Sequence, residues 1–190
     1  MAKLYFRYGA MGSSKTANIL MVRYNYLEKG KKVALLKPDI ENRDGKMKIK
    51  SRIGLEAECE YVSVFLKRFF SSPYELDAIL IDEAQFMSKE EVEKFAYIVD
   101  IFEIPVLCYG LRTDFQTKLF PASKRLFELA DVIEEIPTIC FCGKKAQVNA
   151  RVVDGKITTQ GEQVMMGGNE SYISLCRKHY YRGISKKSEE

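Results

Sequence analysis

Hydrophobic positions follow two different periods along residues 1–136 of the chain. Short apolar runs at residues 3–8, 32–36, 60–63, 77–82, 105–109 and 132–135 predict buried strands. Between them, apolar positions recur at helical spacing over residues 14–29, 64–70, 89–102 and 122–130. Ser88 and Glu91 form a capping-box pattern at the start of the third helix. The alternation of strands and helices predicts an α/β fold with a parallel sheet.

Two stretches break this rhythm. Residues 37–54 are polar and show neither period, which is typical either of a functional loop or of a flexible surface loop, and the pattern leaves both open. After Pro137 the chain changes to cysteines, glycines and short β-like runs, with a hairpin predicted over residues 146–158. We therefore predict an α/β domain at 1–136, a small second domain at 137–182 and a flexible tail at 183–190.

Composition narrows the class of protein. The chain has 190 residues, of which 46% are hydrophobic and 29% charged, as in globular proteins. Its net charge of +4 is too small to indicate nucleic-acid binding, and no apolar run approaches the roughly 18–20 residues of a membrane span. The odd count of 5 cysteines and the absence of an export signal favour free thiols or a metal site in a cytoplasmic protein.

Residues 6–19 read FRYGAMGSSKTANI and form the strongest motif. The segment resembles the phosphate-binding pattern GxxxxGK[ST], in which loop N–H groups surround phosphates, the lysine contacts them and the hydroxyl binds Mg²⁺. Ser14 stands where the pattern has glycine, and the alternative is a Gly/Ser-rich surface turn. The predicted phosphate-binding residues are Gly9, Ala10, Met11, Gly12, Ser13, Ser14, Lys15 and Thr16.

Asp82 and Glu83 end a predicted apolar strand that we expect to lie beside the first strand. Asp82 is then placed to hold Mg²⁺ together with Thr16. Because neighbouring strand residues point in opposite directions, Glu83 would face a second ligand and accept its proton. The alternative is a solvated acidic turn. Glu83, Ala84 and Gln85 extend the predicted ATP site, and the pattern indicates phosphoryl transfer without naming the acceptor.

Cys140 and Cys142 precede the predicted hairpin, and Cys176 and His179 follow it. Two pairs of soft ligands flanking a loop predict a structural zinc site. The single residue between Cys140 and Cys142 is a shorter spacer than usual. The alternative is that the cysteines are small buried apolar residues and that the histidine lies on the surface.

The ordered set of motifs resembles the thymidine kinases of the small, zinc-containing type found in bacteria and in the cytosol of higher cells. The matching segments are GAMGSSKT, DEAQF at 82–86, GLRTDF at 110–115, CFCG at 140–143, GEQV at 161–164, GGNESY at 167–172 and CRKH at 176–179. The resemblance implies a P-loop domain with a RecA-like parallel sheet flanked by helices, plus a small zinc-binding lasso domain.

The resemblance also implies an activity and a set of roles. The enzyme would transfer phosphate from ATP to the 5′-hydroxyl of thymidine, with Mg²⁺ on Thr16 and Asp82, Glu83 as general base and a structural Zn²⁺. Residues 161–172 would form a lasso over thymidine, Arg43 and Glu41 would lie near the sugar, and dTTP would inhibit a homotetramer. The implied thymidine contacts are Met11, Arg43, Phe86, Leu111, Phe115, Phe120, Gln163, Val164, Gly168 and Tyr172.

Three positions depart from the family pattern: Ser14, the short Cys140–Cys142 spacing, and Glu41 in place of aspartate. Two rival functions stay open, a nucleic-acid-dependent P-loop ATPase and a zinc module that binds nucleic acid. The family reading expects neither nucleic acid nor a membrane as partner.

Overall fold

Six parallel strands form the central sheet of the computed structural model, which describes residues 1–40, 47–161, 163 and 172–185. The strand order is β5-β2-β6-β7-β1-β8. The strands are β1 (Leu4–Tyr8), β2 (Val33–Lys37), β5 (Glu60–Tyr61), β6 (Ala78–Ile81), β7 (Val106–Gly110) and β8 (Val132–Glu135). The predicted parallel α/β fold is confirmed.

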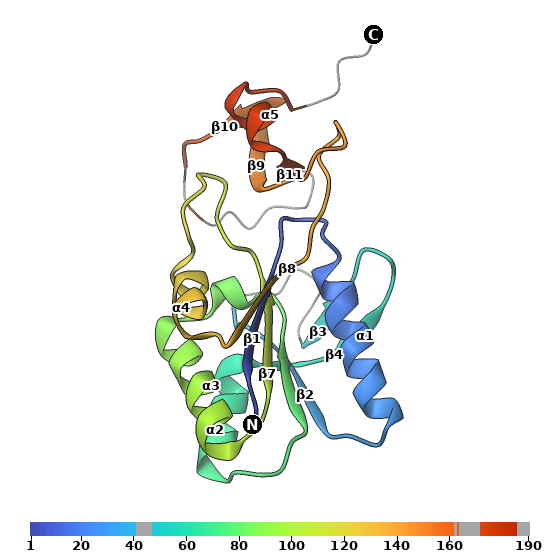
Figure 1. Ribbon diagram of the computed structural model, residues 1–190, viewed down its shortest axis with the longest axis vertical. Coiled ribbons are helices and arrows are strands. Elements are labelled where there is room, and N and C mark those ends of the chain that lie inside the picture. The colour runs from blue at the N-terminus through green and yellow to red at the C-terminus, as the bar shows by residue number, and fades with distance from the viewer. Residues whose placement is uncertain (41–46, 162, 164–171, 186–190) are drawn as a thin grey trace.

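Helices cover both faces of this sheet (Figure 1). Helix α1 (Lys15–Glu28) packs on one face, and α2 (Val62–Ser71), α3 (Lys89–Phe102) and α4 (Pro121–Leu129) pack on the other. Ser88 and Glu91 form the predicted capping box of α3. Within the described residues, no helix combines the length and apolar character needed to cross a membrane.

The order of the strands corrects one expectation. Strand β6, which leads to Asp82, does not lie beside β1, because β7 pairs with both of them. Strand order depends on the crossovers between strands, and the hydrophobic pattern of the individual runs does not encode it. The carboxyl ends of β1 and β6 still open on the same edge of the sheet, since all of these strands are parallel.

Part of the polar stretch is ordered as a hairpin. Strands β3 (Lys48–Lys50) and β4 (Glu56–Glu58) pair antiparallel beside α1, and Ile49 is buried between them and the sheet. Each strand is only 3 residues long, so it has too few positions to display an alternating pattern.

A second, smaller sheet lies above the carboxyl ends of the main strands (Figure 1). Its strands β9 (Val148–Val153), β10 (Lys156–Thr158) and β11 (Tyr172–Leu175) are antiparallel in the order β10-β9-β11, followed by helix α5 (Arg177–Tyr181). Cys140, Val148, Leu175 and Tyr180 belong to a separate apolar cluster inside it. We call residues 138–184 the C-terminal module; a domain boundary at Pro137 stays a prediction.

Candidate functional site

The loop between β1 and α1 is held close to its neighbours. Gly9 donates its N–H to the carbonyl oxygen of Gly110 at 3.2 Å. A Cβ atom at Gly9 would lie 2.3 Å from the carbonyl oxygen of Ile136 and 2.4 Å from Oγ of Ser13, so only glycine allows this approach. The loop therefore leaves the sheet in a fixed direction.

Lys15 holds residues 9 and 10, which we call the inner half of the loop. Its ammonium donates to the carbonyl oxygens of Gly9 at 3.0 Å and Ala10 at 2.9 Å, and the side chain is buried. The ammonium also lies 3.3 Å from the hydroxyl oxygen of Ser13. A cation held by carbonyl oxygens inside a loop at a helix N-terminus is placed to meet phosphate oxygens.

Ser14 is the N-cap of α1 and has φ 60° and ψ 24°, the left-handed region. A side chain is disfavoured there because its Cβ crowds the backbone, whereas glycine adopts this conformation at little cost. The departure from the loop pattern thus falls at a position where the backbone does require positive φ.

Asp82 and Thr16 bring two oxygen ligands together. Asp82 is buried beside the Thr16 hydroxyl, and it accepts the N–H of Glu83 at 3.0 Å. Burial, followed by the negative charge of Glu83, raises the pKa of Asp82 to about 7. A carboxylate and a hydroxyl beside a phosphate loop are the donor set that Mg²⁺ uses, and a cation there would favour the ionised carboxylate.

Glu83 follows the strand rather than belonging to it. Strand β6 ends at Ile81, and Glu83 has φ 51°, so a left-handed turn and not strand alternation separates its side chain from that of Asp82. This corrects the alternation argument. Backbone strain at a non-glycine residue is common in functional sites.

Gln85 orients the Glu83 carboxylate. Its side-chain amide donates to Oε2 of Glu83 at 2.6 Å, and its carbonyl oxygen accepts the N–H of Leu111 at 2.9 Å. A Cβ at Gly110 would lie 2.7 Å from that same oxygen. Gln85 is itself buried, so both ends of its amide are committed and Glu83 is held in one direction.

These parts meet around one cavity of about 260 Å³. The predicted site residues that line it are Met11, Gly12, Ser14, Lys15, Thr16, Glu83, Gln85, Phe86 and Leu111. The lining combines polar and charged groups of the loop with the apolar side chains of Phe86 and Leu111, and it includes the Glu83 carboxylate. Such a cavity suits a ligand with a charged part and an apolar part.

Other predicted nucleoside contacts lie outside that wall. Phe120 packs edge-on against Phe86 with ring centroids 5.9 Å apart. Phe115 is buried under the guanidinium of Arg151, whose carbon lies 3.7 Å from the ring centroid, and the same guanidinium donates to the Tyr172 hydroxyl at 2.7 Å.

Gln163 lies beside the loop that follows β7, since its amide donates to the carboxylate of Asp114 in that loop at 2.9 Å. The remaining predicted contacts lie outside the described residues: Glu41, Arg43, Val164 and Gly168.

The β3–β4 hairpin contributes cations that the sequence analysis did not predict. Lys50 and Arg52 line the cavity opposite the phosphate loop. A Cβ at Gly12 would lie 3.7 Å from a guanidinium nitrogen of Arg52. The only sequence signal was the basic character of a stretch that otherwise read as a loop.

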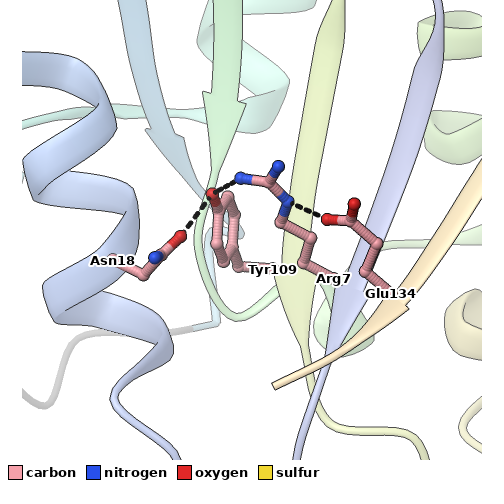
Figure 2. A network of polar contacts seen from close by, with 4 residues as sticks. All are labelled: Arg7, Asn18, Tyr109 and Glu134. Carbon is pink, nitrogen blue, oxygen red and sulfur yellow. Dashed lines mark hydrogen bonds and ion pairs between the residues drawn. The ribbon is translucent and has the colours of Figure 1, made fainter. Parts of the chain in front are cut away.

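A polar network anchors α1 to the sheet (Figure 2). The Tyr109 hydroxyl donates to Oδ1 of Asn18 at 2.9 Å and accepts from the Arg7 guanidinium at 2.7 Å. Arg7 in turn contacts the Glu134 carboxylate at 2.6 Å. Asn18 lies one turn after Lys15, so this network fixes the helix that carries Lys15 and Thr16. Sequence reasoning missed it because the partners come from separate strands.

The four predicted metal ligands converge in the C-terminal module. The ligand atoms of Cys140, Cys142, Cys176 and His179 all lie within 4.8 Å of one another. Sγ of Cys142 lies 3.9 Å from Sγ of Cys176, and Sγ of Cys140 lies 3.3 Å from Nδ1 of His179. Tetrahedral zinc with bonds of about 2.3 Å to sulfur separates sulfur ligands by about 3.8 Å. The arrangement is compatible with zinc, and the short spacer displaces none of the four ligands.

The comparisons with known proteins agree with this geometry. The family model described as thymidine kinase matches residues 2–180. A thymidine kinase of Lactococcus lactis is 48% identical over 187 residues, covering 96% of this chain and 98% of that protein. A thymidine kinase of Shewanella oneidensis is 46% identical over 186 residues, covering 95% and 97%.

Similarity to solved structures is much weaker. The replication initiator DnaA bound to AMPPCP and single-stranded DNA aligns with a TM-score of 0.44 and 18% identity, over 72% of this chain and 41% of that one. The family match covers nearly the whole chain, residues 2–180. The chain belongs to the thymidine kinase family.

Proposed function

We propose that this enzyme transfers the γ-phosphate of ATP to the 5′-hydroxyl of thymidine, giving dTMP and ADP. One observation carries the proposal: Glu83, oriented by Gln85, lines the same cavity as Lys15 and Thr16 of the phosphate loop and as the apolar residues Phe86 and Leu111. A base in that position can reach a hydroxyl whose sugar and base lie on the apolar side.

Each residue then has a role in one displacement. Glu83 takes the proton of the 5′-hydroxyl, and the oxygen forms a bond to the γ-phosphorus. The bond from that phosphorus to the β,γ-bridging oxygen breaks, and its electrons leave with ADP. Lys15 and N–H groups at the start of α1 hold the phosphates, and such positioning is where most catalysis of phosphoryl transfer arises.

Thr16 and Asp82 would hold Mg²⁺. The fit rests on their two neighbouring oxygens and on a buried carboxylate that is costly to ionise without a cation nearby. The ion would supply positive charge against the polyphosphate. Lys15 and the loop would still orient the donor.

On the acceptor side, we propose that the lasso at residues 161–172 covers thymidine. Phe86, Leu111 and Met11 line the cavity. Phe120 packs against Phe86, and Phe115 and Tyr172 both contact the Arg151 guanidinium. Feedback inhibition by dTTP is part of the proposal, because one molecule could occupy the nucleoside pocket and the phosphate loop together.

Zinc would be structural, because all four ligands come from the protein and leave no open position.

We also propose a cytoplasmic homotetramer. An exposed apolar stripe on α1 supports association: the exposed fractions are 56% for Met21, 65% for Tyr24 and 42% for Leu27. Light scattering at micromolar concentration tests this, and a monomeric mass would reject it.

Substitution of the proposed base tests the mechanism. Glu83→Gln should lower kcat by about 10² or more, because a positioned base contributes about that factor. The affinities for ADP and thymidine should stay near those of the unaltered enzyme, since the amide preserves shape. Initial rates and calorimetric titrations measure both quantities.

Glu75→Gln is the matched control, because Glu75 is an exposed glutamate outside the cavity wall. Its kcat should equal that of the unaltered enzyme. Near-normal turnover in Glu83→Gln would remove Glu83 from the role of base.

A further inference from the structure

Residues 11 and 12, which we call the outer half of the phosphate loop, are held by the C-terminal module. The N–H of Met11 donates to Oδ1 of Asn149 at 2.7 Å, and the hydroxyl of Ser174 donates to the carbonyl oxygen of Met11. Asn149 lies on β9 and Ser174 on β11, and the two residues face each other in the strand register. Two adjacent side chains therefore bind both polar groups of one loop residue.

Asn149 is fixed at its other end as well. Its amide nitrogen donates to the carbonyl oxygen of Thr113 at 3.3 Å, and the residue is 4% exposed. Because the Met11 N–H can only donate, the amide oxygen must face it and the amide nitrogen must face Thr113. One buried amide thus joins the phosphate loop to the loop that follows β7.

The next loop residue has a weaker tie to the same module. The Thr138 hydroxyl donates to the carbonyl oxygen of Gly12 at 3.3 Å. Lys15 holds the carbonyl oxygens of Gly9 and Ala10 from inside, so the two halves of the loop have different supports. The inner half depends on α1, and the outer half depends on the C-terminal module.

We propose that Asn149 and Ser174 form a clamp that positions the phosphate loop for nucleotide binding. The clamp acts through Met11 and does not itself touch the phosphates, so both are positioning residues. A loop held at Met11 presents its N–H groups in the binding geometry before the nucleotide arrives, which reduces the ordering cost of binding.

The clamp is also continuous with the acceptor side of the site. Tyr172, a predicted thymidine contact, is the first residue of β11, and Ser174 lies two residues later on the same strand. Thymidine in contact with Tyr172 would act on the strand that holds Met11. Thymidine and nucleotide binding should therefore be coupled through this strand.

The test is the affinity for Mg-ADP, measured by calorimetry without thymidine. Ser174→Ala and Asn149→Ala should each weaken ADP binding by about fivefold, the equivalent of losing one net hydrogen bond. Ser174→Thr keeps the hydroxyl and should restore most of the affinity. Both side chains bind the same residue, Met11. The double Ala variant should therefore lose less ADP affinity than the product of the two single-variant factors.

A matched control comes from the same small sheet. Thr158→Val removes a hydroxyl on β10 that bonds only locally, to Gln160, and should leave ADP binding unchanged. In addition, KM for ATP should rise in the Ala variants more than kcat falls. A general loss of structure would not be reversed by Ser174→Thr.

Unchanged ADP affinity in a folded Ser174→Ala variant would overturn the proposal, and so would equal losses in Ser174→Ala and Ser174→Thr. If Asn149→Ala does not fold, the Ser174 pair decides alone. The proposal rests on the proposed function only in that the loop binds nucleotide phosphates. A chain that binds ADP but does not phosphorylate thymidine would reject that function and leave the clamp intact.

Discussion

Ser14 shows how a single side chain can conflict with the backbone that its position requires. The loop must turn into α1 through a left-handed residue, and φ at Ser14 is 60°. Nothing else in the loop can take over this turn, because Gly12 already supplies its own positive φ of 76°. The protein therefore carries strain beside Lys15, in the segment that binds phosphate.

Replacing Ser14 by glycine should relieve that strain. We expect Ser14→Gly to raise the free energy of unfolding by about 0.5–1 kcal/mol, the left-handed penalty less the added freedom of glycine in the unfolded chain. Urea denaturation measures the change. Ser14→Ala is the matched control, because alanine keeps a Cβ at the same φ; an equal gain in both variants would contradict the account.

Single residues also mark the limit of sequence reasoning. The spacing of Lys15, Thr16, Asp82 and Glu83 was enough to predict that these side chains meet. Their conformations were not predictable, because the left-handed turn at Glu83 and the amide bridge from Gln85 arise only when β6 and β7 lie together. The sequence signal at Asn149 was weak, a single polar residue between the apolar residues Val148 and Ala150. The structure buries it.

Elements with a clear hydrophobic period were predictable, whereas β11 and α5 were not predicted. Helix α3 has the predicted bounds, and strand β8 does too, because the apolar period and the capping box are local properties. The β3–β4 hairpin was missed because its strands are too short to show a period. The separation of β1 from β6 by β7 is a tertiary property that no local pattern contains.

The four-ligand cluster joins three separate parts of the C-terminal module. Cys176 follows directly after β11, and its sulfur lies 3.6 Å from Nδ1 of His179. A metal ion there would tie β11 and α5 to the Cys140 turn. Because β11 also carries Ser174, loosening the cluster should disturb the phosphate loop as well as the lasso.

Cys176→Ser tests this dependence. The variant should lose most of its zinc, from about one ion per chain, and its Tm should fall by about 5 °C or more, because a structural zinc site contributes folding energy. KM for thymidine should rise with it. Elemental analysis, a thermal scan and initial rates measure the three effects.

Cys108→Ala is the control for Cys176→Ser, since Cys108 is buried in β7, away from the cluster. It should keep its zinc. A folded Cys176→Ser variant with unchanged metal content and KM would reject a structural metal at these four residues.

The complete molecule assembles its site from segments far apart in sequence. The phosphate loop, the Asp82–Gln85 turn and the β3–β4 hairpin contribute to the cavity. The C-terminal module lies above the main sheet and holds the phosphate loop through Asn149 (Figure 1). The supports of that loop include the Lys15 ammonium, the Tyr109 network through α1, the Gly9–Gly110 contact and the Asn149–Ser174 clamp. Phosphate binding and acceptor binding thus share one framework.

The most direct test of phosphoryl transfer to thymidine is ADP release by the purified protein with Mg²⁺ and ATP. The reaction is run without acceptor, with thymidine, with deoxycytidine and with single-stranded DNA. We predict turnover that requires thymidine and is suppressed by dTTP. Turnover that is indifferent to thymidine and stimulated by DNA would contradict the account and make the chain a nucleic-acid-dependent ATPase.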